Sequence, residues 1–115
     1  MRGRLSQERG EVAVVAPAGR IDANTAGGLE RAVFQRLNAG EARLVVDLAG
    51  VEYISSAGLR VLLKAARAAR SQGGALVLCA MGPSVREVFD LAGLAPIFAI
   101  EDSRERALAR AAEGA

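Results

Sequence analysis

The chain has 115 residues, of which 51% are hydrophobic and 24% are charged. This length and composition predict a single folded domain over residues 1–115 and exclude a mostly disordered chain. Fifteen cationic side chains stand against thirteen anionic ones, and the resulting net charge of +2 is weak evidence for nucleic-acid binding. With no histidine and one cysteine, the chain lacks both a Ser-His triad and a nitrogen or sulfur cluster for zinc or iron.

The compartment is predicted from cysteine usage and hydropathy. Cys79 stands between apolar Leu78 and Ala80, which indicates a buried thiol in a reducing environment. The first residues contain no apolar stretch of signal-peptide length. The longest apolar run, at 75–81, is far shorter than the roughly 20 residues needed to cross a bilayer. We therefore expect a cytoplasmic protein with no membrane insertion.

The amino-terminal part of the chain predicts a hairpin and a helix. A weak extended segment at 5–9 and a β-branched apolar run at 12–16 predict a β-hairpin. After a break that contains proline and glycine, leucine and valine recur every four residues. This spacing predicts a helix that Asn24 or Thr25 caps and that runs to about Asn38.

The middle of the chain predicts two buried strands around a second helix. The run at 44–48 is apolar on both faces, which is typical of a strand inside a parallel sheet, and a loop through Gly50 follows. The second helix begins at Ser55 or Ser56, either of which can cap it, and a pair of glycines ends it. A near-continuous apolar strand then occupies 75–81.

The carboxyl-terminal part completes an alternating pattern. Gly82-Pro83 opens a third helix, whose predicted inward-facing residues are Val85, Val88, Phe89 and Ala92. A short strand is predicted at 97–100, and Asp102 or Ser103 caps a terminal helix. The order β-β-α-β-α-β-α-β-α predicts an α/β fold with a mostly parallel central sheet of about five strands and about four helices.

The loop after the strand at 44–48 is the best candidate site, because ligands and partners gather at the carboxyl ends of parallel strands. There Ser55 and Ser56 stand at a helix start, where backbone N–H groups and the helix dipole favour a phosphate. A serine that only caps the helix explains the local sequence equally well. Gly58 indicates either a close backbone approach or a partner that rests on it.

Three segments together resemble the STAS domain family of bacterial anti-sigma factor antagonists. They are GRIDANT at Gly19–Thr25, LVVDLAGVEYISSAGLRVLL at Leu44–Leu63 and VREVFDLAGL at Val85–Leu94. The segments follow the family's order and separations, so the resemblance covers nearly the whole chain and implies a STAS-like domain. It also implies a cycle in which the unphosphorylated protein binds an anti-sigma factor serine kinase of the GHKL type and releases its client. The kinase then phosphorylates the protein, and a PP2C-type phosphatase resets it.

The resemblance also assigns roles by position. The family's phosphorylated serine falls on Ser56, and Ser55 replaces the aspartate that usually precedes it, so Ser55 is the second candidate. Asp22 matches a family acidic residue near the partner surface, while its alternative role is to accept N–H groups of its own turn.

A basic edge follows the serines along the same predicted helix. Arg60, Lys64 and Arg67 recur at helical spacing, which indicates either a solvated face or a docking edge for an acidic partner. The complete predicted partner-binding set is Asp22, Ser55, Ser56, Gly58, Arg60 and Lys64.

Two other classes of function remain open at this point. Some STAS domains are scaffold subunits of lipid-transport or stress-sensing assemblies. Because the usual aspartate before Ser56 is missing, this alternative stays open. An enzyme is the weakest hypothesis, because the chain has no P-loop, no Rossmann glycine pattern and no histidine base. We expect no catalytic residue, no cofactor and no metal.

Overall fold

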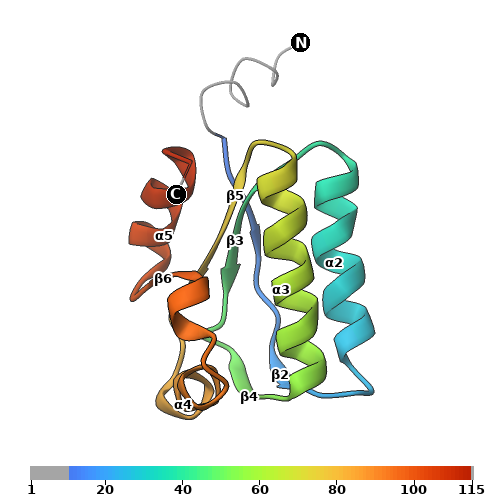
Figure 1. The fold of residues 1–115 in the computed structure, drawn as a ribbon, viewed down its shortest axis with the longest axis vertical. Coiled ribbons are helices and arrows are strands. Elements are labelled where there is room, and N and C mark those ends of the chain that lie inside the picture. Colours follow the sequence, from blue (N-terminus) through green and yellow to red (C-terminus); the bar gives the residue numbers. More distant parts are fainter. Residues whose placement is uncertain (1–10, 115) are drawn as a thin grey trace.

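The computed structural model describes residues 11–114. Within this range, strands and helices alternate along most of the chain (Figure 1). The strands are β1 (Ala13–Val15), β2 (Gly19–Ile21), β3 (Arg43–Asp47), β4 (Val51–Ile54), β5 (Ala75–Cys79) and β6 (Ala99–Glu101). The helices are α2 (Ala26–Asn38), α3 (Ser56–Ser71), α4 (Pro83–Leu91), the short 3-10 helix η1 (Ala95–Ile97) and α5 (Arg104–Ala112). The predicted α/β class is therefore confirmed.

The main sheet is parallel and has the strand order β1-β3-β5-β6. Figure 1 shows α2 and α3 on one face of this sheet and α5 on the other. Alternate residues of the central strands supply the two faces: Val46 and Leu78 pack toward α2 and α3, whereas Val45 and Val77 pack toward α5. Covering both faces explains why these strands are apolar along their whole length.

A second, two-stranded parallel ribbon of β2 and β4 lies near the carboxyl end of the main sheet (Figure 1). The sequence analysis missed both strands: it placed a break at β2 and a loop at β4. Each strand is very short, and a glycine precedes or begins it, so local signals indicate a turn. Their pairing, Ile21 with Ile54, joins segments far apart in the chain, and local sequence does not encode it.

Other predicted boundaries also require correction. The last strand is Ala99–Glu101 rather than 97–100, because Pro96 lies in η1 and leaves Ile97 52% exposed. Ala92 is exposed at the end of α4 instead of facing inward, and Val88 is only half-buried. The strand predicted at 5–9, and with it the hairpin, lies outside the described residues.

An ion pair between buried Asp47 and exposed Arg104 links α5 to the centre of the sheet. Asp47, at the end of β3, accepts a hydrogen bond from Arg104 Nε at 2.8 Å and another from the Ala49 N–H at 2.9 Å. Burial raises the pKa of Asp47, but the two hydrogen bonds and the positive charge of Arg104 together outweigh burial and hold the pKa below its ordinary value. Burial, with the nearby Asp47 charge, raises the pKa of the Cys79 thiol to about 11, consistent with its predicted place in the core.

None of the helices between residues 11 and 114 combines the length and the apolar character that a membrane span requires.

Candidate phosphorylation and partner site

The two adjacent serines have different environments at the start of α3. Ser55 is the N-cap residue in an extended conformation, and its N–H donates to the Ile21 carbonyl of β2 at 2.8 Å. The Ser55 Oγ is buried and has no hydrogen-bond partner among the described residues. Ser56, the first helical residue, is exposed. Of the two adjacent serines, Ser56 is therefore the accessible one.

The start of α3 lacks the usual compensation of a helix terminus. The N-cap side chain accepts no hydrogen bond from the helix, and the first turn carries no acidic residue. A helix of 16 residues thus presents the partial positive charge of its N-terminus without an acidic side chain in its own first turn. Such a terminus favours an anion placed at Ser56.

Gly58 allows α3 to lie directly on the β2–β4 ribbon. A Cβ atom at this position would lie 2.7 Å from both Ile21 Cγ2 and Ile54 Cγ1, closer than side chains tolerate. Of the two explanations that the sequence left open, the structure therefore shows the close backbone approach. Because Gly58 is buried, it offers a partner little surface, and its predicted place in the binding set needs this correction.

Asp22 follows Ile21 and so lies beside the start of α3. Its Oδ1 accepts a hydrogen bond from the Asn24 N–H at 3.0 Å and lies 3.3 Å from Thr25 Oγ1. The Thr25 hydroxyl in turn donates to the Arg20 carbonyl and accepts from the Asp22 N–H, both at 2.8 Å. Asp22 thus has the turn-forming role that was its alternative explanation, and it holds the loop between β2 and α2 next to the serines.

The three cations of the predicted basic edge differ in their contacts. Lys64 Nζ donates a hydrogen bond to Glu30 Oε2 on α2 at 2.6 Å and lies 5.4 Å from the centre of the Phe34 ring. Its positive charge therefore contacts two residues of the neighbouring helix. Arg60 and Arg67 are exposed and form no ion pair with residues 11–114. Sequence spacing alone could not separate Lys64 from the two arginines.

Sequence reasoning missed a stacked pair next to the serines. Arg20 of β2 and Tyr53 of β4 are register partners, and the guanidinium carbon lies 4.4 Å from the ring centre. Tyr53 remains 38% exposed. Strand β4 offered little signal, because its four residues run buried, exposed, exposed, buried and do not alternate. This pair adds an exposed aromatic and cationic surface beside Ser55.

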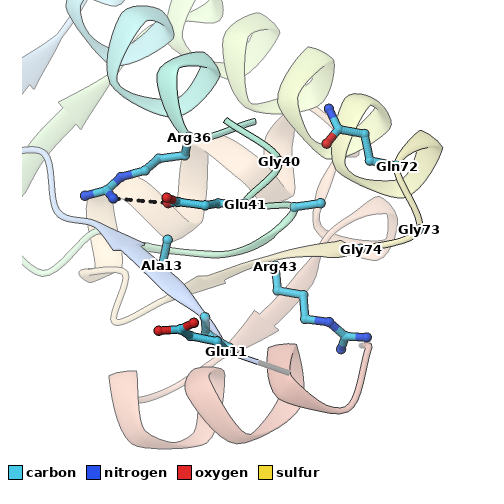
Figure 2. A pocket seen from close by; sticks show the side chains of 11 residues that line it. Glu11, Ala13, Arg36, Gly40, Glu41, Arg43, Gln72, Gly73 and Gly74 are labelled. Carbon is cyan, nitrogen blue, oxygen red and sulfur yellow. Dashed lines mark hydrogen bonds and ion pairs between the residues drawn. The ribbon is translucent and has the colours of Figure 1, made fainter. Parts of the chain in front are cut away.

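A polar pocket of about 320 Å³ lies at the opposite end of α2 and α3 (Figure 2). Three of its charged side chains already have structural partners: Arg36 pairs with Glu41 at 3.1 Å, and Arg43 donates to the carbonyls of Ala111 and Ala112 that end α5. This pocket is therefore no part of the serine site. Across the described part of the chain, no group of three or more acidic or cysteine side chains is placed to hold a metal ion.

Comparisons with known proteins agree with this architecture. The family model described as STAS domain matches residues 5–107. BtrV of Bordetella bronchiseptica, named as an anti-sigma factor antagonist, is 45% identical over 91 residues, which cover 79% of this chain and 78% of BtrV. A crystal structure of an anti-sigma factor antagonist from Mycobacterium paratuberculosis is 32% identical, with a TM-score of 0.74, and the match covers 87% of this chain and 85% of that chain.

The fold is also similar to that of SpoIIAA, an anti-sigma factor antagonist and cell fate determinant of Bacillus. Its unphosphorylated form matches with a TM-score of 0.73, 22% identity and 88% coverage of each chain. Its phosphorylated form matches with a TM-score of 0.65 and 20% identity over 88% of this chain and 91% of that chain. At these identities the likeness shows the fold alone. From the family model and the relative BtrV, the chain belongs to the STAS domain family.

Proposed function

We propose that this chain is an anti-sigma factor antagonist of the bacterial cytoplasm whose binding to an anti-sigma factor serine kinase is controlled by phosphorylation of Ser56. The names of the relatives support the general role. One observation carries the assignment to Ser56: its side chain is exposed at an uncompensated helix start, whereas the neighbouring Ser55 Oγ is buried.

The chemistry requires little of this chain beyond an accessible hydroxyl group. The Ser56 oxygen forms a bond to the γ-phosphorus of ATP, the bond from that phosphorus to ADP breaks, and the hydroxyl proton passes to a base. A kinase of the GHKL type supplies the nucleotide and the base. Hydrolysis of the phosphoserine by a PP2C-type phosphatase regenerates the hydroxyl group.

The effect on binding follows from the added charge. A phosphoserine carries about −1.5 to −2 charges at neutral pH, and in a tight interface it brings like-charge repulsion and a desolvation cost. A change from nearly all bound to nearly all free requires about 5.5 kcal/mol of differential affinity. The helix N-terminus stabilises the phosphate within the free chain, so the switch acts at the interface and leaves the fold unchanged.

Phosphorylation by the cognate kinase tests the proposal. The purified chain is incubated with ATP and its cognate anti-sigma factor kinase, and the product is analysed by intact-mass and peptide mass spectrometry. We expect one added phosphate, which Ser56→Ala abolishes and Ser55→Ala retains. A phosphate on Ser55, or no phosphate at all, contradicts the proposal.

A scaffold subunit that is not phosphorylated is the second candidate. The observation that favours it is at Ser55, which stands where the family usually has an aspartate. The Ser55 side chain makes no hydrogen bond there. The two candidates differ in the same experiment, because a scaffold subunit gains no phosphate and binds its partners equally well after Ser56→Asp.

A further inference from the structure

A shallow groove of about 220 Å³ runs between the first halves of α2 and α3. Its lining includes four small apolar residues, namely Ala26, Gly27, Ala57 and Val61. Three charged residues, Glu30, Arg60 and Lys64, form its sides. Ala57, which directly follows Ser56, belongs to the lining, so the groove begins at the proposed phosphorylation site.

The charges along the groove do not balance. Glu30 and Lys64 face each other across the two helices at 2.6 Å and neutralise one another. Arg60 is exposed and forms no hydrogen bond or ion pair with any side chain that the structure describes. The groove therefore combines small apolar lining residues with one uncompensated guanidinium group. A short, acidic segment with a small apolar side chain complements both features.

Arg60 also lies within reach of Ser56. The two residues are four positions apart on α3, which places their Cβ atoms about 5–6 Å from each other on one side of the helix. An acidic group that precedes a basic group at this spacing is the favourable order on a helix. A phosphate on Ser56 would accept paired hydrogen bonds from the guanidinium group.

We propose that Arg60 anchors a carboxylate of an acidic segment of the protein partner in this groove, and that the phosphate on Ser56 competes for the same guanidinium group. The second step rests on the proposed phosphorylation of Ser56. Phosphorylation then acts twice: it places negative charge at the interface, and it withdraws the cation that the partner's carboxylate requires.

The internal pair is tested without any partner. Phosphoserine is incorporated at position 56 during synthesis, and the phosphate is titrated by 31P NMR at low ionic strength. In the Arg60→Gln variant we expect the titration midpoint to rise by about 0.3 pH units, because the dianion loses its counter-charge. Arg67→Gln, two turns further along the same helix, is the matched control and leaves the midpoint unchanged. Equal midpoints in all three proteins would overturn the proposed interaction between the phosphate on Ser56 and Arg60.

The docking step is tested with the purified anti-sigma factor and the unphosphorylated chain. We expect Arg60→Glu to weaken binding at least about tenfold, whereas Arg67→Glu changes it by less than about threefold. Arg60→Gln serves as a milder second variant, and circular dichroism verifies the fold of each. Equal losses in the two Glu variants would show general electrostatic attraction and overturn the groove assignment. Undiminished binding by Ser56→Asp would instead refute the proposed function and leave the Arg60 result standing.

Discussion

Replacement of Gly58 by alanine is the sharpest test of how the site is positioned. The new methyl group would lie 2.7 Å from Ile21 Cγ2 and Ile54 Cγ1 and 3.1 Å from Ile54 Cδ1. Both isoleucines are buried, with exposures of 3% and 0%, and their branched side chains have little rotational freedom. The strain of such overpacking costs about 1–3 kcal/mol, whereas alanine in a helix gains up to about 1 kcal/mol over glycine.

We therefore expect Gly58→Ala to lower the free energy of unfolding by about 1 kcal/mol, with a decrease in Tm of about 5 °C. Urea unfolding followed by circular dichroism measures the first quantity, and a thermal melt measures the second. Gly27→Ala is the matched control, because a Cβ there meets only Arg31 Nη1 at 3.7 Å. The control should be stabilised by about 0.5–1 kcal/mol. Equal or greater stability of Gly58→Ala would refute the argument that close packing requires a glycine.

Three further predictions concern the core and the helix cap. Because its pKa is lowered, Asp47 stabilises the fold above the ordinary pKa of aspartate and loses this effect as the pH falls through its own lower value. The stability advantage of the wild type over Asp47→Asn should therefore shrink on acidification in urea titrations, and a constant difference would contradict this. Cys79, with a pKa of about 11, should react with a thiol reagent at pH 8 only after unfolding, and rapid labelling of the native protein would contradict its burial. Ser103→Ala removes the acceptor of the Arg106 N–H and should cost about 1 kcal/mol in the same unfolding assay, whereas an unchanged midpoint would show that the cap contributes nothing.

The buried strands and the long helices could be predicted because their signals are local. Strands β3 and β5 are apolar on both faces, and the spacing of Leu29, Val33 and Leu37 matches the buried side of α2. Strands β2 and β4 could not be predicted in the same way. Each depends on its partner across about thirty residues of chain, and the glycines around them give turn signals instead.

The candidate site was located by the sequence, but its details depend on tertiary contacts. The resemblance placed the phosphate on Ser56, and local sequence left Ser55 as an alternative. Only the tertiary structure shows that the Ser55 hydroxyl group is buried where α3 meets β2, whereas Ser56 is exposed. Likewise, only the tertiary structure shows that Lys64, one of the predicted docking cations, pairs with Glu30 on another helix.

The central claim is that a phosphate on Ser56 ends binding to the anti-sigma factor without a change of fold. Isothermal titration calorimetry of that partner with the unmodified chain and with the chain carrying phosphoserine at position 56 tests it most directly. We predict an affinity at least about a hundredfold lower for the phosphorylated chain. Affinities within about twofold of each other would contradict the claim.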